Sequence, residues 1–145
     1  MLKTINISSK IPVPAEQAWT AISNIGGLEL WFPIISECRV TGDGVGATRI
    51  LTLENGGTMT DIIELIDHQQ RRLQYNRIQS PFPVQSYIGT VEVHATGQHA
   101  CELSWTIDMD VAEAEAAELA EFVKQAISDG IQGLAQALTT TQPAL

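Results

Sequence analysis

Hydrophobic and polar residues alternate through most of the chain before residue 111, a pattern typical of β-strands with one buried face. A first strand is expected where Ile5 and Ile7 alternate with polar residues, and Pro12 and Pro14 end it. Six more strands are expected, and the short connections between them favour antiparallel neighbours. Their expected ranges are 34–40, 47–54, 58–66, 72–78, 85–95 and 101–110.

Three segments have the period of a helix instead. Residues 15–25 predict a short helix that begins beside Pro14, and residues 28–32 predict another short helical turn. Residues 113–138 predict one long amphipathic helix. Its apolar stripe consists of Leu119, Phe122, Val123, Ala126, Ile127, Leu134 and Leu138.

The order of these elements predicts an α+β fold, because one long helix has to cover one face of a consecutive antiparallel sheet. The order resembles the helix-grip fold. In that fold a curved seven-stranded antiparallel sheet wraps round a long C-terminal helix, two short helices lie between strands 1 and 2, and a ligand cavity lies between sheet and helix. We expect residues 1–145 to form a single domain of this kind.

Alternation also predicts the face of each strand that meets the helix. In residues 58–66, Met59, Asp61, Ile63 and Leu65 fall together on the inner side. The inner sides of the other strands carry Arg49, Leu51, Tyr75, Arg77, Tyr87, Gly89 and Trp105, among others.

Three of these inner residues are charged: Arg49, Asp61 and Arg77. An unpaired buried charge costs several kcal/mol, so each of them requires a partner, water or a ligand. One interpretation is that Asp61 pairs with a neighbouring arginine only to satisfy the sheet. The other is that the three form the polar end of an otherwise apolar ligand cavity.

Two glycines lie within one turn of the predicted long helix, at Gly130 and Gly133. Each costs roughly 1 kcal/mol relative to alanine inside a helix. They indicate either a close approach of the helix to the sheet or to a ligand, or a helix end that begins to fray.

Several segments resemble the SRPBCC (START-like) proteins of the polyketide cyclase/dehydrase type. The resemblance spans nearly the whole chain in the right order and extends to the birch-pollen-allergen-like proteins and the plant abscisic acid receptors. The segments that carry it are Val13-Pro14-Ala15, Trp19, Gly27-Leu28, Trp31-Phe32-Pro33, Val45-Gly46-Ala47-Thr48-Arg49, Gly57-Thr58-Met59-Thr60-Asp61, Leu65-Ile66-Asp67, Arg71-Arg72, Tyr75, Pro83-Val84, Ser86-Tyr87 and Trp105.

This resemblance implies cavity positions for Asp61 and Tyr87, with Arg49 near them, and loops at 55–58 and 80–84 beside the cavity mouth. Ser36 matches the position of a receptor lysine that holds the ligand carboxylate, so hormone reception of that kind does not carry over. The candidate ligand-binding residues are Ser36, Arg49, Leu51, Met59, Asp61, Ile63, Tyr75, Arg77, Phe82, Tyr87, Gly89, Trp105, Phe122, Ala126 and Gly130.

Asp61 is also the candidate catalytic residue. Its carboxylate is a candidate general base for enolisation or cyclisation of a polyketone, with an arginine or tyrosine stabilising the enolate oxygen. The three histidines have no metal-ligand spacing, and no glycine-rich phosphate loop is present, so we expect no metal and no cofactor.

The formal net charge is −9, and the acidic residues gather in the C-terminal third. This balance argues against nucleic acid or an anionic membrane surface as the main partner. Two cysteines, Cys38 and Cys101, provide no disulfide framework, and we expect free thiols. No signal peptide or membrane-spanning run is recognised, so the expected location is cytoplasmic.

Three functions remain open. The leading hypothesis is a carrier, sensor or chaperone that binds a small hydrophobic or amphipathic molecule. The second is a polyketide cyclase or dehydratase that uses Asp61 as its base, although nothing in the sequence establishes turnover. The third is a homodimeric interaction module with a vestigial cavity.

Overall fold

The alternating segments form seven β-strands in the computed structural model, which describes residues 1–140. Each expected strand is present, with ends that differ by one or a few residues because hydrogen bonding continues into the turns. The strands are β1 (Leu2–Ile11), β2 (Ile35–Thr41), β3 (Thr48–Leu53), β4 (Thr58–Asp67), β5 (Arg72–Gln79), β6 (Val84–Gly97) and β7 (Ala100–Val111).

The helical segments also form where they are expected. Helix α1 (Ala15–Ser23) begins directly after Pro14, and η1 (Leu28–Leu30) is a single 3₁₀ turn. Helix α2 (Glu113–Thr140) runs to the end of the described residues. The first helix is shorter than the expected 15–25, because Ile25 adopts a left-handed backbone conformation with a φ of 61° and cannot continue it.

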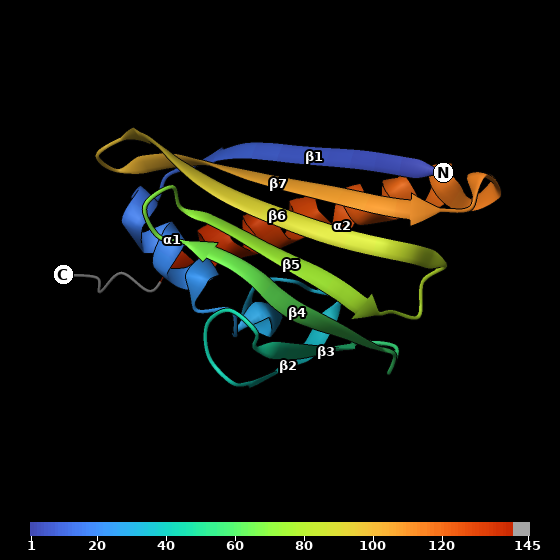
Figure 1. Cartoon of the computed structure of the whole chain (residues 1–145). Coiled ribbons are helices and arrows are strands. Elements are labelled where there is room, and N and C mark those ends of the chain that lie inside the picture. The colour runs from blue at the N-terminus through green and yellow to red at the C-terminus, as the bar shows by residue number, and fades with distance from the viewer. Residues whose placement is uncertain (141–145) are drawn as a thin grey trace.

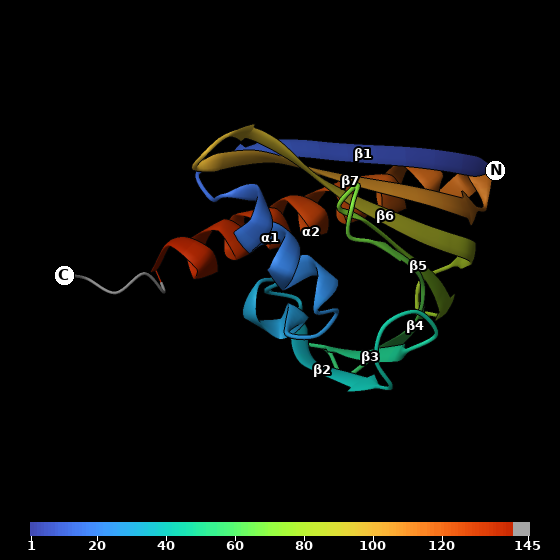
Figure 2. The ribbon, with the colours of Figure 1, turned by 60° about the vertical axis from the view of Figure 1, so that its left-hand side comes forward.

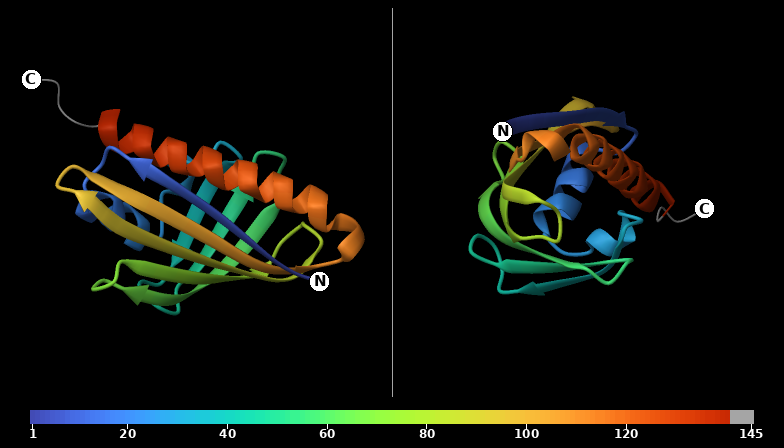
Figure 3. Two further views of the ribbon diagram at one scale, coloured as in Figure 1. Left: turned by 90° about the horizontal axis from the view of Figure 1, so that it is seen from above. Right: turned by 90° about the vertical axis from the view of Figure 1, so that its right-hand side faces the viewer.

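All seven strands form one antiparallel sheet in the order β1-β7-β6-β5-β4-β3-β2. The sheet curves, and α2 runs across its concave face from the end of β7, while α1 lies on the same side against β6 and β7 (Figures 1 and 2). Seen from above and from the side, α2 runs along the concave face of the curved sheet (Figure 3). This is the expected α+β helix-grip architecture.

Strand register decides which inner residues face each other. Arg49 on β3 pairs with Asp61 on β4, and Asp61 pairs in turn with Arg77 on β5. The register of β4 against β5 then shifts between Ile63 and Leu65. The shift turns Leu65 to the outer face, where it is 37% exposed, so the expectation that Leu65 faces inward is wrong.

The buried face of the long helix differs from the expected stripe at several positions. Leu119, Val123, Ile127 and Leu134 are buried, but Phe122 remains 42% exposed. Ala116, Ala120 and Ile131, which were not assigned to the stripe, are buried. Phe122 therefore lies at the border between the core and the solvent.

Candidate functional site

The three inner charged residues form one buried ion triad, defined here as Arg49, Asp61 and Arg77. Arg49 donates through Nε and Nη2 to Oδ2 of Asp61, at 3.1 and 2.9 Å. Arg77 donates through Nε to Oδ1 at 2.8 Å and through Nη2 to Oδ2 at 3.3 Å. Both carboxylate oxygens of Asp61 therefore accept hydrogen bonds from arginines. Asp61 is fully buried, so neither oxygen faces solvent.

A strained backbone segment completes the triad. Arg49 donates through Nη1 to the carbonyl oxygen of Ile25 at 3.1 Å. Ile25 is the β-branched residue with positive φ after α1, a conformation that such residues rarely adopt. Asp61 accepts hydrogen bonds from Nε and Nη2 of Arg49. The turn between α1 and η1 supplies the acceptor for the remaining nitrogen, Nη1.

Two tyrosines flank the triad and connect it to the core. The guanidinium of Arg77 lies 4.6 Å from the ring centroid of Tyr87 and 5.4 Å from that of Tyr75. Arg49 approaches the ring of Tyr75 at 4.9 Å. The Tyr75 hydroxyl accepts a hydrogen bond of 3.2 Å from the indole nitrogen of Trp105. Cation–π contacts of this kind favour charged arginines in an aromatic environment.

Gly89 makes room for this arrangement. A Cβ atom at Gly89 would lie 2.2 Å from Cζ of Tyr75, because the tyrosine ring lies directly across the paired strand. Only a glycine lets the ring occupy that position. Gly89 therefore contributes to the site through the position of Tyr75.

The electrostatics keep the polar end of the site positive. Burial is the largest single influence and lowers the pKa of Arg77, but the charge and hydrogen bonds of Asp61 act together with the neighbouring Tyr87 and Tyr75 and raise the pKa of Arg77 above its usual value. Burial, and then proximity to Tyr75, raises the pKa of Tyr87. At neutral pH both tyrosines are protonated, and the triad carries two positive charges and one negative charge.

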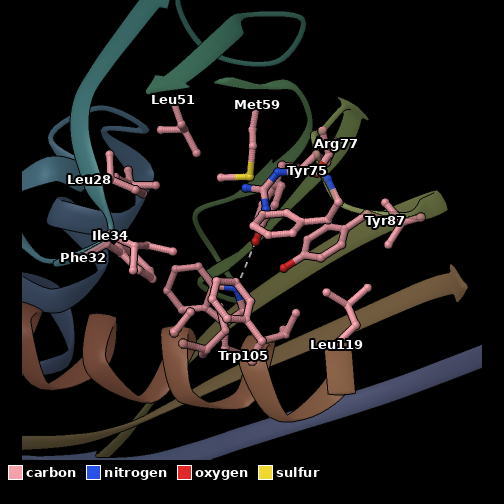
Figure 4. Close-up of a pocket in the computed structure, with 18 residues that line it drawn as sticks. Leu28, Phe32, Ile34, Leu51, Met59, Tyr75, Arg77, Tyr87, Trp105 and Leu119 are labelled. Carbon is pink, nitrogen blue, oxygen red and sulfur yellow. Dashed lines mark hydrogen bonds between the residues drawn. The ribbon is translucent and has the colours of Figure 1, made fainter. Parts of the chain in front are cut away.

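A cavity of about 50 Å³ lies between this polar end, the sheet and α2 (Figure 4). Its walls are almost entirely apolar and aromatic, and Arg77 is the charged residue that lines it. The lining residues are Leu28, Phe32, Ile34, Ile35, Leu51, Met59, Tyr75, Arg77, Ser80, Phe82, Val84, Tyr87, Trp105, Leu119, Phe122, Val123, Ala126 and Ile127.

The candidate ligand residues divide into those that line the cavity and those that do not. Nine of them line it: Leu51, Met59, Tyr75, Arg77, Phe82, Tyr87, Trp105, Phe122 and Ala126. Arg49 and Asp61 lie behind Arg77 as its support. Ile63 and Gly89 are buried in the sheet beside Tyr75, without lining the cavity.

Ser36 and Gly130 also lie outside the lining. Ser36 is exposed next to an irregularity in β2, and its hydroxyl donates to the carbonyl of Thr52 at 3.2 Å. A Cβ at Gly130 would lie 2.2 Å from the ring of Phe32, and one at Gly133 would lie 2.0 Å from the Trp31 carbonyl oxygen. The two glycines therefore mark a close approach of the helix, as one of the two interpretations predicted, and that approach is to the segment after η1 and not to the sheet.

Sequence reasoning missed half of the lining. Leu119, Val123 and Ile127 belong to the apolar stripe of α2 and could have been selected from it. Leu28 and Phe32 lie in segments that carry the family resemblance, but nothing local indicates that they face a cavity. Ser80 and Val84 were not named singly, although they belong to the loop 80–84 that the resemblance places beside the cavity mouth, and Ile34 and Ile35 complete the missed residues.

We also searched the described residues for a metal site, a membrane-spanning helix and disulfides. Within residues 1–140, no group of three or more His, Cys, Asp or Glu side chains is arranged to hold a metal ion. In the same part of the chain, no helix is long and apolar enough to cross a membrane. Cys38 and Cys101 are free thiols, as expected.

Comparisons with known proteins agree with the fold. A sequence model of the family described as polyketide cyclase / dehydrase and lipid transport matches residues 4–139. A comparison with curated protein sequences finds no significant match.

Solved structures with this fold come from bacteria and plants. An uncharacterized protein from Bacillus thuringiensis is 25% identical, with a TM-score of 0.85 over 94% of this chain and 99% of that one. Norcoclaurine synthase from Thalictrum flavum, solved with dopamine and hydroxybenzaldehyde, is 18% identical, with a TM-score of 0.80 over 99% and 90%. The Zhui aromatase/cyclase from a Streptomyces species is 15% identical, with a TM-score of 0.81 over 99% and 98%.

Proposed function

Because this chain belongs to the polyketide cyclase/dehydrase and lipid transport family, we propose that it binds a small amphipathic molecule between its sheet and α2. The apolar part of the ligand packs against the aromatic walls, and its oxygen-rich or anionic end meets Arg77 and Tyr87. The protein then acts as a carrier, sensor or chaperone for that molecule. The two free thiols support a reducing, cytoplasmic setting.

The observation that carries this proposal is the position of Arg77. Its side chain is only 10% exposed, yet it lines the cavity, while Asp61 behind it is fully buried. The triad holds more positive than negative charge, and an anionic group on the ligand would balance it inside a medium where charge interactions are strong. A buried guanidinium held by a carboxylate is a preorganised anchor for such a group.

The same geometry weighs against Asp61 as a general base. A base has to come within hydrogen-bond reach of the proton that it removes. Asp61 does not line the cavity, and its two oxygens already accept four hydrogen bonds from the arginines. Catalysis through Asp61 would first require Arg77 to leave, so we place binding ahead of cyclase or dehydratase activity.

Two fluorescent probes that differ by one anionic group test the proposal. The first is 1-anilinonaphthalene-8-sulfonate, and the second is N-phenyl-1-naphthylamine, which has the same rings without the sulfonate. We expect Arg77→Gln to weaken sulfonate binding by about 10- to 100-fold, since hydrogen bonds to charged groups contribute about 1.5–3 kcal/mol. The neutral probe should bind both proteins equally well.

The matched control is Arg39→Gln, which removes an exposed arginine from β2 outside the cavity and should change neither affinity. Thermal unfolding verifies that both variants fold. Equal losses for the two probes in Arg77→Gln, or no loss for either, would show that Arg77 is not an anion anchor. Turnover of a polyketone that Asp61→Asn abolishes, in a variant still folded, would favour the cyclase instead.

A further inference from the structure

The wall between the cavity and the solvent beside it consists of only a few side chains. Outside the cavity lies a groove of about 340 Å³, which we call the outer groove. Cavity and groove share three lining residues, Phe82, Leu119 and Phe122. The outer groove is completed by Pro83, Glu115 and Glu118. The two spaces are therefore neighbours on either side of one thin partition.

The cavity alone is too small for the ligand that its chemistry favours. Its volume of about 50 Å³ admits a few water molecules, whereas sites for small molecules usually measure about 300–1,000 Å³. The outer groove, which is open to solvent, is the space of about 340 Å³ nearest to the cavity on this side. A ligand anchored on Arg77 therefore has to extend through the partition or enlarge the core.

Two of the three side chains in the partition are aromatic rings that contact each other. Phe82, in the loop between β5 and β6, contacts Phe122 of α2 with ring centroids 5.1 Å apart. Phe122 is 42% exposed, so its ring can rotate toward the solvent without leaving a buried hole. The loop itself is held by a hydrogen bond of 3.1 Å from the Phe82 N–H to the Ser80 hydroxyl. The contact between these two rings is therefore the place where side-chain rotation would join the two spaces.

We infer that the outer groove is a second part of the same binding site, and that the ligand is an elongated amphipath with a single anionic end. This inference rests on the proposed function. The anionic end lies at Arg77, the chain passes between Phe82 and Phe122, and the far end lies in the outer groove. Glu115 and Glu118 are both exposed there, and their negative charge excludes a second anionic group at that end.

Straight-chain carboxylates test the length of the site. Isothermal titration calorimetry with hexanoate, octanoate, decanoate and dodecanoate should give an affinity that rises about fourfold per added methylene, the value expected for burying one CH₂. Phe122→Ala should accelerate association of dodecanoate, measured by stopped flow, more than association of hexanoate. An affinity that stops rising after hexanoate would overturn the inference and leave the proposed function intact.

Decanedioate tests the charge at the far end. Wild-type protein should bind it more weakly than decanoate, and the double variant Glu115→Gln/Glu118→Gln should reduce that difference at least threefold. The matched control is Glu113→Gln/Glu121→Gln, which removes two charges from α2 outside the groove. An equal effect of both double variants would refute the charge selection. Absence of binding for every carboxylate would refute the proposed function itself.

Discussion

Asp61→Asn changes the centre of the ion triad while keeping its shape. The amide occupies the same volume as the carboxylate but removes the single negative charge that Arg49 and Arg77 share. One amide oxygen cannot accept what two carboxylate oxygens accept now, and the amide NH₂ would face an arginine donor. Two guanidinium groups would then remain buried side by side without a counter-charge.

The expected cost follows from the burial of the triad. Side-chain exposure is 4% for Arg49, 10% for Arg77 and zero for Asp61, so little water reaches the pair of cations. Removing one partner of such a buried ion pair costs about 3–5 kcal/mol. Since whole domains are stable by about 5–15 kcal/mol, the variant should retain only part of its stability. At about 3 °C per kcal/mol, the midpoint of thermal unfolding should fall by about 10 °C or more.

Urea unfolding followed by circular dichroism measures this loss. Glu37→Gln is the control, because it breaks the Arg39–Glu37 ion pair on the surface, where both side chains are more than half exposed. That substitution should cost no more than about 1 kcal/mol. A loss below about 1 kcal/mol for Asp61→Asn would refute the reasoning, because the two arginines would then find other partners or solvent.

A third variant separates the structural role of the triad from its role in binding. Replacing all three residues with apolar ones (Arg49→Met, Asp61→Leu, Arg77→Met) removes every buried charge together. Apolar replacements of complete buried ion clusters are often neutral or stabilising. We expect this variant to be more stable than Asp61→Asn and yet to lose the preference for the sulfonate probe over the neutral one. Such a result would assign the charges to ligand recognition.

Two further predictions concern packing and pH. Alanine favours helices, but Gly133→Ala should still destabilise the protein by about 1–3 kcal/mol in urea unfolding, because its Cβ would lie 2.0 Å from the Trp31 carbonyl oxygen. Gly97→Ala is the control and should cost less, because a Cβ there meets no atom within 4 Å. Equal costs for the two variants would refute the packing argument. Stability should fall above about pH 10, where unfolded tyrosines lose their protons, because burial raises the pKa of Tyr75 and of Tyr87 in the folded protein. The stability that the buried tyrosines contribute is fully present below about pH 10 and is lost as the pH rises through their pKa values in the folded protein. Tyr87→Phe should make the free energy of unfolding fall less steeply with pH, and an unchanged slope would contradict this explanation.

Most of the architecture was predictable because it depends on local periodicity. Alternation identified every strand and, apart from Leu65, the inner residues discussed here. It also placed Arg49, Asp61 and Arg77 on the same face, which indicated a polar cluster before any contact was known. Leu65 was misassigned because a shift of strand register has no signature in the alternation itself.

The candidate site was predictable only in part. Residues such as Tyr75, Tyr87 and Trp105 line the cavity because strand alternation determines their face. Ser36 was selected by resemblance alone, and the structure leaves it exposed at an irregular edge strand. Phe32 was missed because its place depends on how the segment after η1 packs against α2. Contacts between elements far apart in the chain leave no periodic trace in either one.

By itself, the amino-acid sequence determined the strands, the long helix and the presence of three charges on inner faces, since each depends on neighbours a few residues away. Only the tertiary structure decided that Asp61 is shared by both arginines and that Arg77 alone of the three reaches the cavity. It also decided that Gly130 and Gly133 accommodate the segment after η1 and that Phe122 meets Phe82 at the border of the core. These features depend on strand register and on the path of α2 across the sheet, and both are set by packing over the whole chain.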